Sequence, residues 1–584
     1  MTAVHATDDL PIRRRRSMPQ ADSTSLSAAI DVARMRLVVT ALVFTLGFLA
    51  IGLRLVDVTV LRADSPARVA NLAGVAGSLG GRSDILDRNG NVLATSLPIA
   101  SVFADPLMVI DPVEAAERLA SVLPELNRDR LVEQLSSDRR FIWIKRGLTP
   151  AQHEAINRLG IPGVAFDREE RRLYPVGNVV SHVLGYTNLD NVGIAGVEQH
   201  FDDLLASGVA PLELSLDLRI QSMVRDELHA SIEDFRAIGG AAMVMDIRSG
   251  EIVSMVSLPD FDPHDRGNAT DEQIFNRNTL GVYEMGSTFK IFNTAMALES
   301  GVATMTSGYD ASDPIRIGRF TINDFHGEDR WLTTPEVFTF SSNIGSARMA
   351  MDVGSAYQQE FLHRLGLTTT PRFDLPEVGS PIAPSRWRDV NMMTISFGHG
   401  ISVSPLQLAT AVAAVVNDGI MVEPTLIRRD PEDYPEGERV LSQRTSEQMR
   451  RLLRLVVADG TGGNADVPGY FVGGKTGTAQ KTGGGGYSAN ARLSSFVSAF
   501  PMHDPRYVVF AMLDEPQGLE RTYGYATGGW TAAPLVGRIV AQMGPMVGLR
   551  PEDPEDPAIL NALELDNAPN LEEQAEGQLA AFTN

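Results

Sequence analysis

An uncharged apolar run, Leu37 to Leu53, constrains this chain more than any other feature, because such a run can cross a membrane. A bilayer core of about 30 Å needs about 20 apolar residues. Arg36 and Arg54 flank the run and can extend it by snorkelling. Arginines before the run favour a cytoplasmic N-terminus. We therefore expect a basic cytoplasmic tail over residues 1–36 and a transmembrane helix over residues 37–57.

A cleaved signal peptide is the alternative interpretation of the same run. No small-x-small cleavage site follows it directly, which favours an uncleaved anchor. The four arginines at 13–16 lie well ahead of the run and lack the residues that follow a twin-arginine signal. Because no other window is comparably apolar, we expect the rest of the chain on the far side of the membrane.

Length and charge limit what the remaining chain can be. The full sequence of 584 residues is too long for one domain. A net charge of −22 argues against nucleic acid as the main partner, because phosphate binding needs a basic surface. The absence of cysteine excludes disulfides, thiol catalysis and thiolate metal sites. After Arg550 the chain is acidic without Lys or Arg, so we expect a disordered tail over residues 549–584.

Residues 58–213 form a separate unit in which strand-like pieces alternate with turns. Asn89-Gly90 between apolar residues predicts a β-hairpin, and amphipathic spacing predicts helices over 112–123 and 129–135. No nucleophile and base occur here at a useful spacing. The sequence therefore indicates a spacer or docking module.

Ser287 and Lys290 are the first candidate catalytic residues. Apolar spacing after Ser287 predicts a helix that stops at Gly301, and positions three apart share a helix face. A serine becomes a good nucleophile when a base takes its proton, and a lysine can be that base if burial and a nearby cation lower its pKa. A helix N-terminus adds N–H groups for an oxyanion. Alone, S-x-x-K is usually a solvated helix face.

A second motif, Ser341-Ser342-Asn343, lies at a corner expected between two short helices. Thr334 can cap the first helix and Pro335 can start it. At such a corner Ser341 and Asn343 could point the same way. Ordinary Ser and Asn caps explain the same letters.

The third motif is a set of four adjacent residues in an expected strand. They are Lys475, Thr476, Gly477 and Thr478. Gly477 has no side chain, so a ligand backbone could lie against this strand. Residues 469–476 also match the phosphate-binding G-x-x-x-x-G-K-T loop, but that loop needs a helix at Lys-Thr, and a glycine run follows here. G-x-S-x-G and H-E-x-x-H are both absent, which disfavours an α/β-hydrolase and a zinc protease.

S-x-x-K, S-x-N and K-T-G occur in this order in one domain, and together they resemble the penicillin-binding protein and serine β-lactamase superfamily. YEMGSTFK, LTTPEVFTFSSNIG, SFGHGISVSPLQLA and GGKTGTAQK resemble the transpeptidase domain of class B penicillin-binding proteins. GRSDILDRNGNVLA and RRLYPVGNVVSHVLGYTNLDNVGIAGVEQHFDDLL resemble their membrane-proximal pedestal. The S-S-N form of the second motif and the lack of an added C-terminal domain most resemble the division-specific peptidoglycan D,D-transpeptidases. Met285 departs from the proline common in the family.

The resemblance implies an α+β multidomain fold. A single N-terminal transmembrane helix would lead into an elongated, mainly β pedestal of the dimerisation type over residues 58–213. A transpeptidase domain over residues 214–548 would follow, with an antiparallel sheet flanked by helices. The catalytic domain would be periplasmic, anchored to the inner membrane and enriched at the division site.

The resemblance also implies a role for each catalytic residue. Ser287 would attack the carbonyl between two D-alanines of a peptidoglycan stem peptide, with Lys290 as its base. Ser341 would relay a proton to the leaving D-alanine. Asn343 would bind Lys290 and the substrate amide.

The third motif would bind the substrate. Lys475 would supply positive charge, and Thr476 and Thr478 would hold the terminal carboxylate beside Gly477. The backbone N–H groups of Ser287 and Thr478 would form the oxyanion hole, where one donor is typically worth about 3 kcal/mol.

The resemblance implies the partners as well. They are donor and acceptor stem peptides, β-lactams bound covalently at Ser287, a membrane glycosyltransferase of the FtsW type and other division proteins, with no metal, organic cofactor or nucleic acid. An elongation-type class B transpeptidase is the nearest alternative. A secreted β-lactamase, a bifunctional wall synthase and a non-catalytic penicillin-binding scaffold or receptor are more distant ones.

Overall fold

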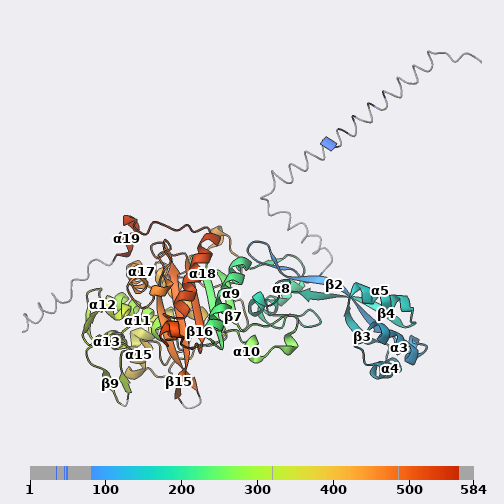
Figure 1. The fold of residues 1–584 in the computed structure, drawn as a ribbon, viewed down its shortest axis with the longest axis horizontal. Helices are drawn as coiled ribbons and strands as arrows, with labels where there is room; N and C mark the ends of the chain where they lie inside the picture. Colours follow the sequence, from blue (N-terminus) through green and yellow to red (C-terminus); the bar gives the residue numbers. More distant parts are fainter. Residues whose placement is uncertain are drawn as a thin grey trace, which may run out of the picture. The chain divides into compact units, whose positions relative to one another are not determined.

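The computed structural model describes residues 81–318, 320–483 and 486–564, together with a few N-terminal residues: Met35, Val38, Leu42, Thr45, Phe48 and Leu49 (Figure 1). The chain divides into two compact units, Met1–Leu72 and Ala73–Asn584, and the fold below is that of the second. The predicted cytoplasmic tail and the membrane helix at 37–57 lie outside the described residues, apart from those six. Within the described ranges, no helix has the length and apolar character needed to cross a bilayer.

The described part of the expected pedestal, residues 81–213, contains a five-stranded sheet. Its strands are β1 (Ile85–Leu86), β2 (Val92–Ala104), β3 (Ile142–Leu148), β4 (Val164–Leu173) and β5 (Leu212–Glu213). The long β2 pairs antiparallel with β1, β3 and β4, and β1 pairs parallel with β5. The predicted hairpin is confirmed: Asn89-Gly90 turns the chain from β1 into β2, with Gly90 at φ 82°.

Helices occupy the pedestal as extensively as strands do. They are α3 (Pro112–Val122), α4 (Arg128–Leu135), α5 (Pro150–Leu159), α6 (Ser181–Leu184), α7 (Gly196–His200) and α8 (Asp202–Ala206). The two predicted helices are confirmed as α3 and α4, capped by Asp111 and Asn127. The expectation of a mainly β pedestal is wrong. The pedestal is mixed because α5, which begins with a Thr149 capping box, and the helices after it add to the strands.

A buried ion cluster ties the pedestal strands to its helices. Glu198 is fully buried and binds two arginines, Arg82 at 2.7 Å and Arg172 at 2.6 Å. Arg82 also pairs with Asp202 at 2.6 Å. Because each buried charge has a partner, the cluster holds β4 against α7 and α8 without leaving an uncompensated ion.

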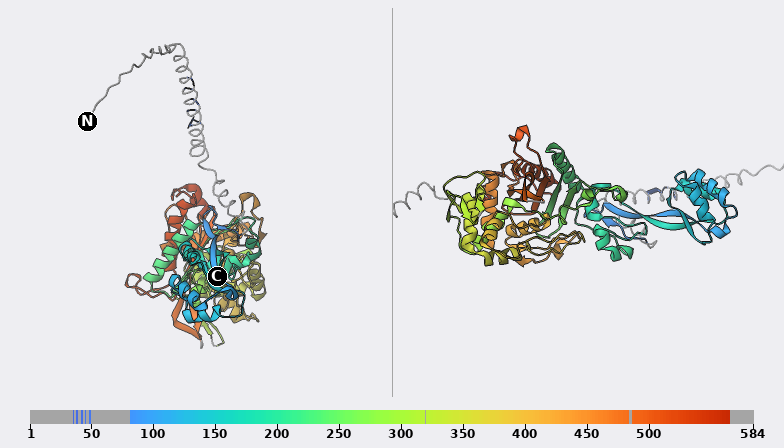
Figure 2. Two further views of the ribbon diagram at one scale, coloured as in Figure 1. Left: turned by 90° about the vertical axis from the view of Figure 1, so that its right-hand side faces the viewer. Right: turned by 90° about the horizontal axis from the view of Figure 1, so that it is seen from below.

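Residues 214–564, here called the body, are built on a second sheet of order β14-β15-β16-β6-β7, antiparallel throughout. Its strands are β6 (Gly239–Asp246), β7 (Ile252–Leu258), β14 (Gly473–Gly483), β15 (Gly486–Phe500) and β16 (Tyr507–Asp514). Figures 1 and 2 show the green strands β6 and β7 in one sheet with the orange strands, although their sequences lie far apart. Helices α10 to α17 come from the chain between β7 and β14.

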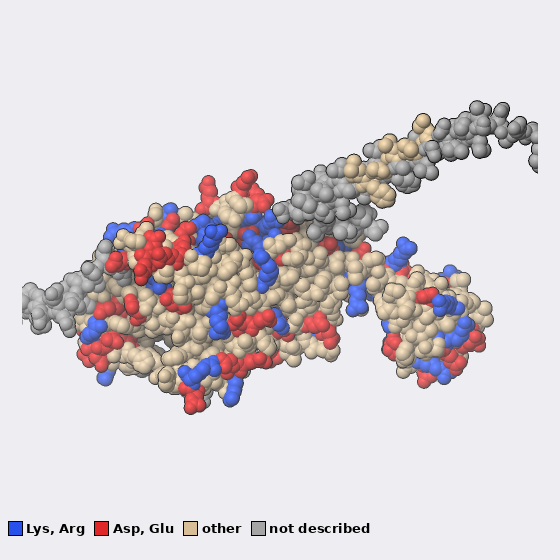
Figure 3. Space-filling view, turned by 45° about the horizontal axis from the view of Figure 1, so that its top comes forward, with Lys and Arg blue, Asp and Glu red and all other residues tan. Residues whose placement is uncertain are grey.

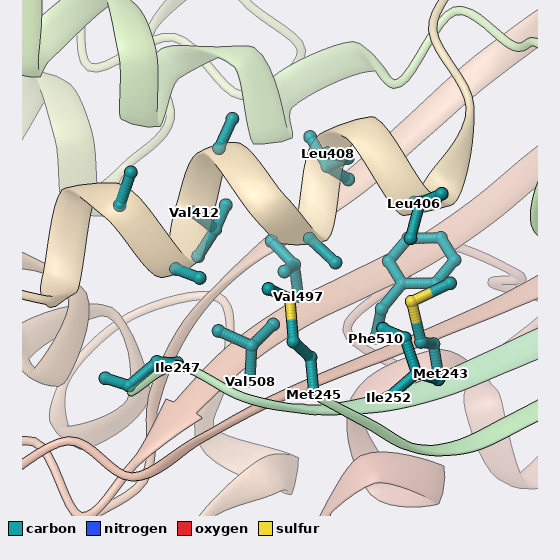
Figure 4. Packing of buried hydrophobic residues seen from close by; sticks show 14 of the residues in the cluster. Met243, Met245, Ile247, Ile252, Leu406, Leu408, Val412, Val497, Val508 and Phe510 are labelled. Carbon is teal, nitrogen blue, oxygen red and sulfur yellow. The ribbon is translucent and has the colours of Figure 1, made fainter. Parts of the chain in front are cut away.

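Side chains alternate between the two faces of this sheet, and both faces are covered by helices. Met243 and Met245 of β6 belong to one apolar cluster, and Ala242 and Val244 to another. Figure 4 shows α16 lying over the first face, with Leu406 and Val412 directed toward the strands. The opposite face is covered by α9 (Leu218–Asp234) and α18 (Ala532–Met546). This position explains why α16 (Pro405–Val416) is apolar apart from Gln407 and Thr410, since all its residues are buried.

The remaining elements of the body lie around this layered core. The helices are α10 (Asp271–Ile274), α11 (Lys290–Glu299), α12 (Thr334–Thr339), α13 (Asn343–Val353), α14 (Ser355–Arg364), α15 (Asp389–Ile395), α17 (Gln443–Ala458) and α19 (Pro557–Leu563). The short strands pair as β8 (Gly308–Asp310) with β11 (Trp331–Thr333), β9 (Ile315–Ile317) with β10 (Phe320–Ile322), and β12 (Ile420–Met421) with β13 (Glu438–Arg439). On the face drawn in Figure 3, acidic side chains gather in several places with basic groups between them.

The first part of the acidic tail is ordered, so the prediction of disorder is wrong up to Glu564. Glu552 donates its N–H to the Gly469 carbonyl at 2.9 Å and pairs with His503 at 2.8 Å. In α19, Ile559 is buried and the Ala562 carbonyl accepts from Arg451. Arg451 and His503, which lie before the tail in the sequence, thus supply the basic partners that the tail itself lacks. Residues 565–584 lie outside the described part of the chain.

Candidate active site

Ser287 lies in a tight turn at the start of α11. Residues Gly286–Phe289 form a 3-10 turn, and the α-helix begins only at Lys290. Gly286 has φ 55°, and a Cβ there would lie 2.6 Å from the Thr478 carbonyl oxygen. Only glycine therefore allows this turn to lie against β14, which places the Ser287 segment beside the K-T-G strand.

The Lys290 amine lies at the centre of the site. Its Nζ is 3.2 Å from Ser287 Oγ, 3.0 Å from Ser341 Oγ and 2.8 Å from Asn343 Oδ1, and it donates to the Ser341 carbonyl at 2.5 Å. Burial, and then the Lys475 charge, hold the pKa of Lys290 well below its usual value, while Asp324 opposes the shift. A neutral amine has a lone pair, so Lys290 can accept the proton of the Ser287 hydroxyl.

Ser341 links the two lysines. It lies at the corner between α12 and α13 and has φ 61°, a left-handed conformation that is strained for a residue with a side chain. Its Oγ accepts from Lys290 Nζ and from Lys475 Nζ, each at 3.0 Å. A hydroxyl held between two amines can pass a proton between them, which is the arrangement that a relay needs.

Asp324 positions the second motif, although it belongs to no motif itself. Its carboxylate accepts from Ser342 Oγ at 2.7 Å and from the N–H groups of Asn343 and Ile344 at the start of α13. It thus caps the helix electrostatically as well as by hydrogen bonding. Asn343 Nδ2 donates to the Asn323 carbonyl at 2.9 Å, which turns Asn343 Oδ1 toward Lys290. Ser342 is the N-cap of α13, but Asp324 lies in a separate loop, so only the folded chain reveals its contacts.

The third motif lies inside a strand, which makes the phosphate-loop interpretation wrong. Lys475 and Thr476 belong to β14 and pair with Val497 and Phe496, so no helix begins there. Lys475 is fully buried, and burial lowers its pKa to about 7. A Cβ on Gly477 would lie 2.6 Å from the Met285 carbonyl oxygen, so this glycine permits the strand to approach the Ser287 turn.

Two further contacts fix the threonines of β14. Thr476 Oγ1 lies 2.9 Å from Thr461 Oγ1, and Thr478 Oγ1 accepts from the Gly528 N–H at 3.2 Å. Thr461 and Gly528 come from loops that carry no motif, so no sequence pattern marks them.

The structure therefore brings the three motifs together. One amine contacts Ser287, Ser341 and Asn343, and Lys475 reaches the same Ser341 oxygen. The predicted corner between helices is present, although Thr333, rather than Thr334, caps α12. Chemically, the site combines a hydroxyl nucleophile, a buried amine of lowered pKa, a relay hydroxyl and a second amine, as acyl transfer requires.

Comparisons with known proteins agree with this geometry. The family described as "Penicillin binding protein transpeptidase domain" matches residues 240–541, and "Penicillin-binding Protein dimerisation domain" matches residues 78–210. The chain is 40% identical over 484 residues to "Probable peptidoglycan D,D-transpeptidase FtsI" of Caulobacter vibrioides, covering 81% of this chain and 82% of that protein. It is 30% identical over 549 residues to "Peptidoglycan D,D-transpeptidase FtsI" of Escherichia coli, covering 88% and 91%.

Solved structures show the same likeness. Penicillin binding protein 3 from Mycobacterium tuberculosis, in complex with aztreonam, superposes with a TM-score of 0.64 at 25% identity, covering 81% of this chain and 98% of that chain. The transpeptidase domain of Burkholderia pseudomallei penicillin-binding protein 3 superposes with a TM-score of 0.53 at 34% identity, covering 58% and 98%.

Proposed function

Because this chain belongs to the penicillin-binding protein transpeptidase family, we propose that it cross-links peptidoglycan stem peptides at the division septum as a class B D,D-transpeptidase. The observation that carries the proposal is the convergence of Ser287, Ser341 and Asn343 on the buried Lys290 amine. A scaffold that only bound peptidoglycan would have no need for a buried lysine of lowered pKa beside a serine.

Acylation is the first step. Lys290 takes the proton from Ser287 Oγ as that oxygen attacks the carbonyl carbon between the two terminal D-alanines. The C–N bond breaks, and Ser341 passes a proton to the nitrogen of the leaving D-alanine. The contacts that support this path are the 3.2 Å from Lys290 Nζ to Ser287 Oγ and the 3.0 Å from Lys290 Nζ to Ser341 Oγ.

The substrate is held by β14 and by the second motif. The N–H groups of Ser287 and Thr478 would bind the oxyanion, and the Thr476 and Thr478 hydroxyls would bind the terminal carboxylate near the Lys475 charge. Support comes from the contact of the Gly286 turn with Thr478, which places the two N–H groups in neighbouring segments. Gly477 leaves room for the substrate backbone along the strand, and Asn343 would bind the substrate amide.

Deacylation completes the cross-link. An amine of a second stem peptide attacks the ester carbon, the bond to Ser287 Oγ breaks, and the serine regains a proton. β-Lactams would acylate Ser287 in the same way and remain attached, because no amine displaces them.

We assign residues 58–213 to the pedestal domain and residues 214–548 to the transpeptidase domain. Family matches over 78–210 and 240–541 support this division. The predicted anchor at 37–57 would hold the enzyme in the inner membrane with its catalytic domain in the periplasm. The FtsI names of the relatives support a septal role, which would require a membrane glycosyltransferase of the FtsW type as partner.

Labelling with a fluorescent penicillin, followed by a growth test, examines the proposal. Ser287→Ala should abolish covalent labelling and fail to support division, whereas the exposed Ser121→Ala on α3 should label and support growth like the wild type. If Ser287→Ala sustained division, the protein would act as a scaffold. A fluorescent fusion should gather at mid-cell, and a distribution along the side wall would point to an elongation role instead. Rapid β-lactam turnover by the purified protein would indicate a β-lactamase.

A further inference from the structure

We propose that Glu284 and His399 form the receiving site for the acceptor, a primary ammonium group on the second stem peptide. Glu284 attracts the ammonium, and His399 takes one of its protons. The inference rests on the transpeptidase function proposed above. It deepens that function by assigning residues to the second half-reaction, the attack of the acceptor amine on the acyl-enzyme, for which the three motifs supply no dedicated group.

The segment that carries His399 is bonded to the segment that leads into Ser287. Tyr283 and Val403 exchange backbone hydrogen bonds of 2.9 and 3.0 Å, and the Gly286 N–H donates to the Gly398 carbonyl at 3.3 Å. Gly398 has φ 81°, and a Cβ on it would lie 2.1 Å from the Gly286 carbonyl oxygen. His399 is therefore the first side chain after a backbone contact with the residue that precedes the nucleophile.

Glu284 is fixed on the same pair of segments. It lies three residues before Ser287, and its Oε1 accepts from the Gly400 N–H at 2.8 Å. Both neighbours of His399 are thus hydrogen-bonded to the segment that precedes Ser287: Gly398 to the Gly286 N–H, and Gly400 to the Glu284 carboxylate. Glu284 and His399 are both half-buried, so a substrate can reach them.

The charges around His399 suit a proton acceptor. Burial lowers the pKa of His399 from its ordinary value of 6.5, with Lys290 acting in the same direction and Glu284 opposing them. The imidazole is consequently neutral at pH 7 and able to take a proton, and the carboxylate next to it stabilises the imidazolium that forms.

The proton count requires such a group. An acceptor enters as an ammonium and ends as an amide, so its nitrogen loses two protons. One goes to His399 and then to water. The nitrogen forms the new C–N bond, the bond from the acyl carbon to Ser287 Oγ breaks, and the second proton reaches that oxygen through Lys290 and Ser341. No oxidant or cofactor is involved.

The test separates acylation from aminolysis in the full-length protein in detergent. An N-acyl-D-alanyl thioglycolate serves as donor, and a stem peptide with a free side-chain amine as acceptor, with the same peptide acetylated on that amine as a blank. Mass spectrometry gives the rates of aminolysis and hydrolysis, and labelled penicillin gives the acylation rate. The variants are His399→Gln and Glu284→Gln, with the exposed His229→Gln on α9 as control.

His399→Gln should lower aminolysis about 100-fold, the usual range for a general base, while penicillin acylation stays within about threefold. Glu284→Gln should raise the acceptor concentration for half-maximal aminolysis about tenfold, the effect of one lost charge worth about 1.4 kcal/mol. It should leave capture by hydroxylamine, which is largely uncharged at pH 8, within about twofold. His229→Gln should behave as the wild type.

Three results decide the matter. Unchanged aminolysis in both variants would overturn the inference while leaving the proposed function intact. Equal losses of acylation and aminolysis would also overturn it, since these residues would then only support the fold of the site, and the melting temperature would fall with them. A wild-type protein that penicillin does not acylate would instead overturn the proposed function itself.

Discussion

Replacing Lys475 by methionine should make the protein more stable at neutral pH while abolishing acylation. The ammonium is fully buried in β14, and burial lowers its pKa from 10.5 to about 7. The unfolded chain therefore binds this proton more tightly than the folded protein does, so protonation favours unfolding. Between pH values of about 7 and about 10.5, the contribution of this group to stability rises with pH.

The size of the effect follows from the two pKa values. At pH 7 the buried lysine destabilises the folded protein by roughly 4 kcal/mol, and at pH 9.5 by about 1 kcal/mol. Methionine has a similar shape but loses the hydrogen bond to Ser341, worth about 1 kcal/mol. We expect a net gain of about 3 kcal/mol at pH 7 and almost none at pH 9.5.

Urea unfolding at the two pH values measures this difference. Lys481 on the same strand is the matched control, because its pairs with Asp514 and Glu515 at 2.8 Å raise its pKa. Lys481→Met should be neutral or destabilising by less than about 1 kcal/mol, as for other half-exposed pairs. A Lys475→Met variant that is less stable at pH 7, or whose gain does not shrink at pH 9.5, would refute the argument from burial.

Three further changes test other parts of the account. Asp324→Ala removes the carboxylate that binds the first N–H groups of α13 while the Ser342 cap remains, and it should lower stability by about 1–2 kcal/mol and slow penicillin acylation at least tenfold. Wild-type values in thermal melts and stopped-flow labelling would speak against a positioning role. Gly286→Ala should lose labelling because its Cβ would meet β14, and normal labelling would show that the turn can move. Glu198→Ala leaves Arg82 and Arg172 buried without a counter-charge and should cost about 3 kcal/mol or more; a smaller loss in urea unfolding would mean that water reaches the cluster.

The sequence could identify the residues that carry chemistry because their types and order are distinctive. Ser287, Lys290, Ser341 and Lys475 were predicted to meet, and hydrogen bonds between them place them in one site. The helix after the serine was predicted as well, although its first turn is 3-10 rather than α. The 3-10 conformation of this first turn depends on the contact of Gly286 with β14. The spacing of apolar residues in the sequence does not predict that contact.

Residues that act from distant loops could not be predicted. Asp324, Thr461 and Gly528 carry no motif and matter only because folding brings them to α13 and β14. The acidic tail was misjudged for a related reason. Its composition predicts disorder when it is considered alone, but Arg451 and His503 of the body bind it up to α19.

Intact-mass analysis after exposure to penicillin shows whether Ser287 is the single nucleophile of an acyl-transfer site. We expect one adduct of the full mass of the drug, mapped by digestion to the peptide that contains Ser287 and missing in Ser287→Ala. An unmodified wild-type protein, an adduct on another residue, or an adduct that persists in Ser287→Ala would contradict it.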